Sequence, residues 1–269
     1  MILAVVSSNN DFFSRLVFVR AASYWEFSLG TCSSMGYMKL KRTQIMLATL
    51  PVAAAVLWGV PAIDLEISRL FFDRGFPSKE QWWHKLLHEG LGYFLWLSML
   101  SVIAIYAFNR LRKRELYGID GRKVCYLLLV LILGAGLIVN VVFKDGFGRA
   151  RPRDIEEFGG SRQFTPAFVI AAECQKNCSF SSGEGAGGFF TLALAYALHR
   201  RREALVAAVG FGILVSWSRI ASGAHFFSDT VVSFFVMLVL TDVLYYYMFS
   251  VSAEPQRLPV ATIPAEATR

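Results

Sequence analysis

The chain has 269 residues, of which 55% are hydrophobic and 17% charged, and its formal net charge is +7. An ordinary soluble domain is excluded, because the charges stand in short blocks between long apolar runs that are typical of membrane helices. A nucleic-acid binder is also disfavoured, because its basic residues would form a stripe with aromatics between them. The sequence therefore predicts an all-α integral membrane protein.

The chain divides into an N-terminal extension (1–38), a membrane domain (39–250) and a tail (251–269). Met35 and Met38 stand directly before a basic K-L-K-R segment and the first strong apolar run, so we expect translation to begin at one of them. The alternative is that the extension holds a short interfacial helix. The tail is rich in proline and is predicted to be disordered and cytoplasmic.

Six membrane helices are predicted from apolar runs of roughly 16 to 23 residues. They lie at about residues 44–60, 90–108, 124–143, 185–198, 204–217 and 228–249, of which the fourth and the fifth are shorter than this range. The loop at 61–89 mixes charges with aromatics, which indicates either a short amphipathic helix in the interface or a cap over the bundle. His84 and His88 are one helical turn apart in this loop, and without a nearby carboxylate partner we interpret them as solvated surface residues.

Basic residues fall on one side of the predicted bundle. They are Lys39, Lys41, Arg42, Arg110, Arg112, Lys113, Arg114, Arg122, Lys123, Arg200, Arg201 and Arg202. The positive-inside rule makes that side cytoplasmic and places both termini there. The loops after the first, third and fifth helices then face outward.

Three polar stretches occupy these outward loops or border them. They are K-D-G-F-G-R-A-R-P (144–152), C-S-F-S-S-G-E-G (178–185) and S-R-I-A-S-G-A-H-F-F-S-D (218–229). Lys144, Arg151 and Arg219 supply the cations that a phosphate group requires, and arginine adds planar pairs of donors. The stretches together predict a phosphate site at the outer membrane–water interface.

Two further pairs complete the predicted chemistry. Ser182 and Gly183 stand where the fourth helix begins, so free backbone N–H groups and the helix dipole can face an anion. His225 and Asp229 are four residues apart and are expected to share a helical face. Asp229 would accept from one ring nitrogen, which leaves the other nitrogen free to attack phosphorus and form a phosphohistidine.

The pattern K-x6-R-P, S-G and S-R-x5-H-x3-D resembles the type-2 phosphatidic-acid phosphatase superfamily over about residues 40–250. The resemblance implies a metal-independent phosphatase without a cofactor. It implies His225 as the nucleophile and Asp229 as its orienting partner. The residues that it implies for phosphate binding are Lys144, Arg151, Ser182, Gly183 and Arg219.

One position departs from the family pattern. The usual P-S-G-H is S-S-G-E here, so Glu184 stands in place of the general-acid histidine. Glu184 is the candidate proton donor only if its pKa is raised. Burial would raise this pKa, whereas Lys144, Arg151 and the helix N-terminus would lower it, so the sign stays open.

The location predicts a phosphorylated membrane lipid as substrate, at the periplasmic face of the bacterial inner membrane. The segments around R-P-R-D and C-x3-C-S-F resemble a branch associated with lipid A phosphatases. Undecaprenyl pyrophosphate and phosphatidylglycerol phosphate remain alternative substrates. A lipid phosphotransferase, a transporter built around Asp242, and a haloperoxidase, which the apolar spans disfavour, are the rival classes.

The cysteines allow one further expectation. Cys174 and Cys178 lie in one predicted outward loop, where an oxidising compartment permits a small disulfide; otherwise they are free thiols. No zinc site fits, because no second Cys/His pair has suitable spacing.

Overall fold

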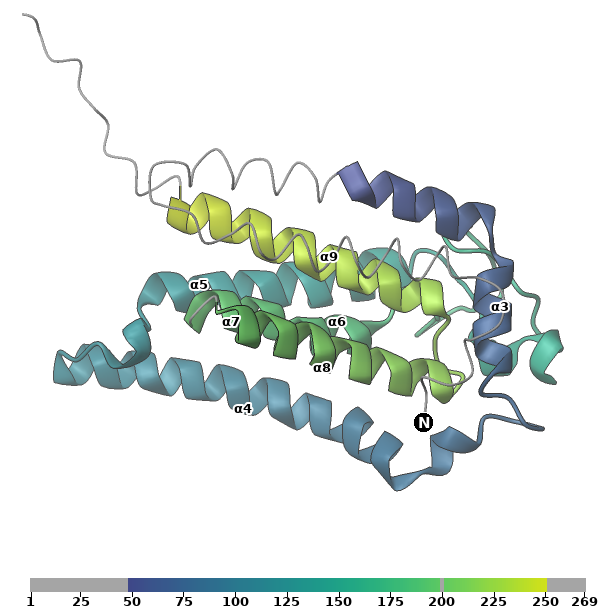
Figure 1. The fold of residues 1–269 in the computed structure, drawn as a ribbon, viewed down its shortest axis with the longest axis horizontal. Helices are drawn as coiled ribbons and strands as arrows, with labels where there is room; N and C mark the ends of the chain where they lie inside the picture. Colours follow the sequence, from purple (N-terminus) through teal and green to yellow (C-terminus); the bar gives the residue numbers. More distant parts are fainter. Residues whose placement is uncertain (1–47, 199–200, 251–269) are drawn as a thin grey trace, which may run out of the picture.

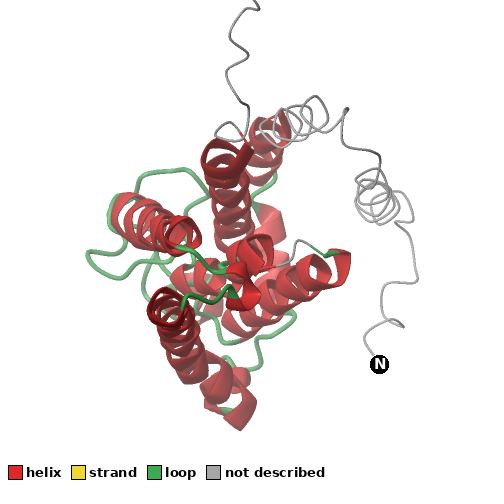
Figure 2. Cartoon of the chain, turned by 90° about the vertical axis from the view of Figure 1, so that its left-hand side faces the viewer, coloured by secondary structure: helices red, strands yellow, loops and turns green. Residues whose placement is uncertain are grey.

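The computed structural model describes residues 48–198 and 201–250, which form a bundle of antiparallel helices (Figure 1). These residues contain no strand, only an isolated bridge between Ile155 and Arg162, and the end-on view is entirely helix and loop (Figure 2). The all-α prediction is confirmed. The extension 1–38 and the tail 251–269 lie outside the described residues.

The helices follow the chain in the order that the apolar runs predict. They are α3 (Ala62–Arg69), α4 (Trp82–Arg112), α5 (Gly121–Leu129), which continues in π-helical turns (Val130–Lys144), α6 (Gly183–Phe189), α7 (Thr191–Leu198), α8 (Arg202–Ala221) and α9 (Phe227–Tyr245), which continues through Tyr246–Ser250. Short 3-10 turns occupy Pro77–Glu80, Leu116–Gly118, Pro152–Asp154 and Glu156–Phe158.

Four described helices are long and apolar enough to cross a membrane: Trp82–Arg112, Gly121–Lys144, Arg202–Ala221 and Phe227–Phe249. A fifth span results if Ala48–Gly59 and α3, which meet at a bend of 73°, are counted as one. The predicted fourth helix is instead two short helices, α6 and α7. The count of six spans therefore stays a prediction.

Helix α6 lies in the centre of the bundle and packs on α8, α9, α4 and the π-helical segment. Small residues make this packing possible. A Cβ on Gly212 of α8 would come within 2.1 Å of the Phe189 ring of α6, so only glycine fits at this contact. Buried Val139, Phe190 and Met237 belong to the same core.

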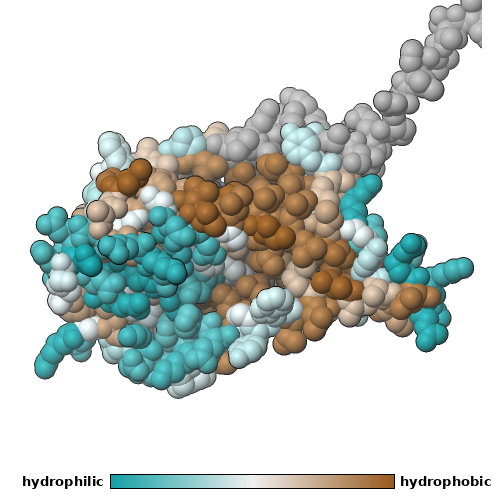
Figure 3. Space-filling model, turned by 180° about the vertical axis from the view of Figure 1, so that it is seen from behind, coloured by the Kyte–Doolittle hydropathy of each residue, from teal (hydrophilic) through white to brown (hydrophobic). Residues whose placement is uncertain are grey.

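The outer surface has the polarity of a membrane protein. In the space-filling view an apolar belt separates a broad hydrophilic end from a smaller one (Figure 3). On α4, Trp96, Leu97 and Leu100 are exposed, which suits a helix that faces lipid.

Different helix termini and loops lie at the two ends of the bundle. At one end lie α3, the start of α4, the start of α9 and the end of α8 (Figure 1). The link between α4 and α5 (113–120) and the start of α8, at Arg202, lie at the opposite end (Figure 1). This alternation is the one that the basic blocks predict.

The start of α4 differs from the prediction. The helix begins at Trp82, eight residues before the predicted 90, after the 3-10 turn at Pro77–Glu80. No glycine or proline interrupts residues 82–89, so the amphipathic segment continues directly into the apolar span. His84 and His88 therefore belong to the first two turns of a long helix.

Candidate active site

A cavity of about 420 Å³ opens at the end of the bundle where the three polar stretches meet. Side chains from α4, α6, α8 and the loops after Lys144 surround it. The lining residues are Lys79, Glu80, His84, Lys85, His88, Glu89, Arg151, Arg153, Asn177, Glu184 and Arg219.

His225 lies next to this cavity, in the turn between α8 and α9, and its side chain is fully buried. Its Nδ1 donates a hydrogen bond of 2.7 Å to the carbonyl oxygen of Ser179. A proton on Nδ1 leaves a lone pair on Nε2. Nε2 has no hydrogen-bond partner among the described residues and lies 3.5 Å from Glu184 Oε2. The imidazole thus presents a nucleophilic nitrogen.

Asp229 supports His225 less directly than predicted. The two side chains do not share a helical face, because α9 begins at Phe227 and His225 precedes it. Asp229 Oδ2 caps the helix by accepting from the Phe226 backbone N–H at 2.8 Å, and it also accepts from Ser179 Oγ at 2.5 Å. It lies 3.6 Å from His225 Nδ1, so its carboxylate orients the segment that holds the ring.

A buried arginine that the motif reading did not single out anchors this arrangement. Arg149 donates to Asp229 Oδ1 at 2.6 Å and to Asp64 Oδ2 at 2.8 Å. It also donates to Ser228 Oγ and stacks 4.2 Å from the Phe226 ring centroid. Arg149 stands two residues before Arg151, and sequence alone cannot separate the structural arginine from the one that faces the cavity.

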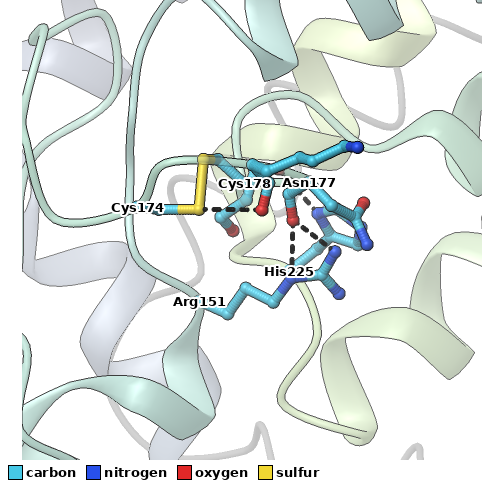
Figure 4. Close-up of a disulfide and its surroundings, with 7 residues drawn as sticks. Arg151, Cys174, Asn177, Cys178 and His225 are labelled. Atoms are coloured by element: carbon cyan, nitrogen blue, oxygen red, sulfur yellow. Dashed lines mark hydrogen bonds between the residues drawn. A yellow bond between two sulfur atoms is a disulfide. The ribbon is translucent and has the colours of Figure 1, made fainter.

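The cavity-facing arginine is held by the disulfide loop. Arg151 donates through Nε and Nη2 to the Asn177 carbonyl oxygen, at 3.2 and 2.7 Å (Figure 4). Burial lowers the pKa of Arg151 from its ordinary value, although a guanidinium stays charged. Cys174 and Cys178 form a disulfide on either side of Asn177, with their Cα atoms 5.5 Å apart. Arg151 and His225 lie beside this same loop (Figure 4).

Ser182 and Gly183 begin α6 as the sequence predicts. Ser182 Oγ accepts from the backbone N–H of Gly185 at 3.0 Å and caps the helix. A Cβ at position 183 would lie 2.8 Å from Asn140 Oδ1 and 3.5 Å from Lys144 Nζ. Glycine therefore lets the helix start come close to the lysine of the first polar stretch.

The Glu184 carboxylate lies among the side chains of His88, Arg219 and His225. Its Oε1 lies 3.3 Å from His88 Nδ1 and 3.5 Å from Arg219 Nη2. Burial alone would raise the pKa of Glu184, but the neighbouring imidazoles of His225 and His88 and the charge of Arg219 outweigh burial and hold this pKa well below its ordinary value. The sign left open by the sequence is therefore negative, and the carboxyl group is ionised.

The interpretation as solvated surface residues is wrong for His84, and for His88, which is exposed, it missed a carboxylate partner. His84 is buried; its Nδ1 lies 2.9 Å from Ser218 Oγ, and its Nε2 lies 3.4 Å from Arg219 Nη1. His88 is half-exposed but pairs with Glu184. The carboxylate partner comes from a segment about 100 residues away, and no local pattern indicates it.

The comparisons with known proteins agree with this geometry. A family model described as "PAP2 superfamily" matches residues 123–252, which include all three polar stretches. A lipid A 4′-phosphatase of Francisella tularensis subsp. novicida is 36% identical over 59% of this chain and 76% of its own length. The chain belongs to the PAP2 superfamily. The resemblance inferred from the motifs is thereby confirmed.

Two further relatives extend the match of this PAP2 superfamily member. The lipid A 4′-phosphatase of Rhizobium etli is 31% identical over 69% of this chain and 79% of its own length. That of Rhizobium leguminosarum is 32% identical over 69% of this chain and 87% of its own length. No solved structure is significantly similar to the chain.

Proposed function

We propose that this PAP2 superfamily protein is a membrane phosphatase that removes the 4′-phosphate of lipid A through a phosphohistidine. The observation that carries the proposal is a set of buried polar atoms beside the cavity. His225 Nε2, Arg219 Nε and Glu184 Oε2 have no hydrogen-bond partner among the described residues. Buried polar atoms are costly without partners, so Arg219 Nε is expected to donate to an anion such as a phosphate group, whose phosphorus His225 Nε2 could then attack. The acceptor Glu184 Oε2 would repel the anion and is expected to pair with a donor group of the substrate instead.

The reaction follows from the positions of these atoms. The cations Lys144, Arg151 and Arg219 hold the phosphate oxygens, with Ser182 and Gly183 at the start of α6. His225 Nε2 attacks phosphorus, and the electron pair of the P–O bond moves to the sugar oxygen, which leaves as an alcohol after taking a proton. Water then attacks the phosphohistidine, which releases phosphate and restores His225.

The substrate assignment rests on the relatives, which are named lipid A 4′-phosphatases and whose length this chain covers by 76–87%. The polarity of the surface supports a lipid substrate, because the broad hydrophilic end borders the apolar belt (Figure 3) and charged residues line the cavity. A phosphorylated headgroup at that depth reaches the cations while its acyl chains stay in the bilayer.

The proposed topology is a bacterial inner-membrane protein with six spans, in which Ala48–Gly59 is the first span and residues 185–198, in α6 and α7, are a broken fourth. The cavity end faces the periplasm and both termini face the cytoplasm. The clustering of Arg110, Arg122 and Arg202 at the end opposite the cavity supports this orientation.

The test of activity uses the purified full chain in detergent with a chelator present. Hexa-acylated lipid A carrying both phosphates, undecaprenyl pyrophosphate and phosphatidylglycerol phosphate are offered separately, and free phosphate and lipid products are measured by mass spectrometry. We expect free phosphate and lipid A without its 4′-phosphate, and no loss of activity with the chelator. Release from one of the other lipids alone would contradict the substrate. Phosphate transfer to another lipid without free phosphate would contradict hydrolysis.

The test of topology uses a chain whose Cys32 and Cys125 are replaced by serine. Single cysteines are placed at Glu157, in the exposed loop of the cavity end, and at Lys113, at the opposite end. A membrane-impermeant thiol reagent on intact spheroplasts should label position 157 and reach position 113 only after permeabilisation. The reverse pattern would refute the proposed orientation.

A further inference from the structure

The first two turns of α4 bring a histidine to the cavity that no family motif includes. His88 Nδ1 lies 3.3 Å from Glu184 Oε1, and 47% of the His88 side chain is exposed. Its ring is nearly parallel to that of His84, with the centroids 5.9 Å apart. His88 thus has one nitrogen engaged by a carboxylate, and it lines the cavity wall.

Glu184 stands between this histidine and the nucleophile. One carboxylate oxygen faces His88 Nδ1 and the other faces His225 Nε2 at 3.5 Å. A phosphoryl group attacked by His225 has its leaving oxygen in line with the attacking nitrogen, on the far side of phosphorus. His88 lies on the far side of Glu184 from His225 and lines the same cavity, so it borders the space that a leaving group would enter.

We propose that His88 is the catalytic residue that gives a proton to the leaving oxygen, and that Glu184 orients it. This inference rests on the proposed phosphatase function and assigns a step that the function requires. Glu184 occupies the position of the usual general acid, but an ionised carboxylate accepts protons and cannot donate one. This carboxylate engages His88 Nδ1, which leaves Nε2 as the ring nitrogen that can face the leaving oxygen.

Proton transfer from His88 accompanies the attack by His225. His225 Nε2 forms a bond to phosphorus while the P–O bond to the sugar breaks and its electron pair goes to the sugar oxygen. The proton on His88 Nε2 moves to that oxygen, which gives a neutral alcohol, a phosphohistidine and a neutral His88. In the second step His88 takes a proton from the attacking water, and the P–N bond breaks to release phosphate.

His84 is the other histidine at the cavity, but its contacts assign it a different role. Both of its ring nitrogens face protein groups, Ser218 Oγ and Arg219 Nη1, and the side chain is buried. It is therefore a positioning residue for Arg219. Of the two α4 histidines, His88 is the one that has a carboxylate partner and an exposed side chain at the open side of the cavity, where the sugar of a lipid substrate would lie.

The experiment compares leaving groups in the full chain. His88→Gln and His88→Ala are assayed on lipid A and on a pair of amphiphiles with the same alkyl chain, an alkyl phosphate and a nitrophenyl phosphate. Leu86→Ala is the matched control, because Leu86 is exposed on the same helical turn and does not line the cavity. Rapid-quench trapping of the phosphohistidine on lipid A measures the first chemical step directly.

We expect both His88 variants to lose roughly 10²- to 10⁴-fold in phosphohistidine formation from lipid A and from the alkyl phosphate, as for loss of a general acid. With the nitrophenyl phosphate, whose leaving group needs no proton, the loss should stay below about 10-fold. Equal losses on both leaving groups, or unchanged formation from lipid A, would overturn the assignment. If Glu184→Gln loses more activity on the alkyl phosphate than on the nitrophenyl phosphate while the His88 variants do not, Glu184 and not His88 is the proton donor. Failure of the wild-type chain to release phosphate from any lipid would refute the proposed function itself.

Discussion

The floor and the rim of the cavity are built on different principles. At the floor, Arg149, Asp64 and Asp229 form a buried ion network that fixes His225 by way of Ser179. At the rim, His88 is half-exposed, and Lys85 pairs with Glu80 through exposed side chains.

The difference follows from what each region has to do. An attacking nitrogen must be held in a fixed position relative to phosphorus, and burial with satisfied charges supplies that rigidity. A proton donor must be recharged from water and must accommodate the entering headgroup, so it belongs where solvent reaches.

Removal of the nucleophile should have the largest effect. His225→Ala should reduce turnover of lipid A by on the order of 10⁴-fold or more, because no other nitrogen occupies the attacking position. The measurement is phosphate release, with acid-labile phosphohistidine trapped in the wild-type chain only. The thermal unfolding temperature should change little. If the variant keeps its turnover of lipid A, His225 is not the nucleophile.

Disruption of the floor network should act on stability. Arg149→Met leaves Asp64 and Asp229 as buried carboxylates without their cation, which should cost about 3–5 kcal/mol of unfolding free energy. The matched control is Arg69→Ala, because Arg69 pairs with Glu66 through exposed side chains and should cost less than about 1 kcal/mol. Detergent-solubilised unfolding curves measure both, and equal costs would contradict the contrast between buried and exposed pairs.

Loss of the disulfide should weaken substrate binding. Cys174→Ser with Cys178→Ser frees the loop whose Asn177 carbonyl oxygen holds Arg151. We expect KM for lipid A to rise roughly 3- to 10-fold with a smaller change in kcat, the size of one weakened charged contact. Limited proteolysis should cut the loop faster in this variant. An unchanged KM and an unchanged rate of cleavage would contradict a role of the disulfide in holding Arg151.

The ionisation of Glu184 should produce the smallest effect, seen only in acid. Its folded-state pKa lies well below 4.5, so its contribution to stability is fully present above 4.5 and is lost as pH falls below it through the folded pKa. Glu184→Gln should therefore unfold more readily than wild type at neutral pH, and the difference should shrink on acidification. Unfolding curves at stepped pH measure this; a constant difference would contradict the lowered pKa.

The motif residues were predictable from the sequence, whereas Arg149, Asp64 and Ser179 of the floor were not. His225, Arg219, Arg151 and Lys144 lie within short, contiguous patterns, because each pattern places its residues at one end of a helix. The number of membrane spans was less predictable. Helix α6 is short and rich in glycine, so hydropathy alone cannot distinguish it from a loop or from part of a span.

The rim was not predictable, and His84 and His88 show the reason. A histidine pair in an amphipathic segment has the same local pattern whether it faces water or a carboxylate. The partner, Glu184, belongs to a different helix, and the pairing exists only because α4 starts at Trp82 and packs beside α6.

The sequence by itself determined the membrane class, the family and the motif residues, because apolar length, basic blocks and motif spacing are local properties of the chain. The tertiary structure alone decided that Arg149 is structural while Arg151 faces the cavity. It also decided that His225 bonds to Ser179, and that His88 meets Glu184. Each of these depends on segments far apart in the chain, and only helix packing brings their side chains within a few ångströms.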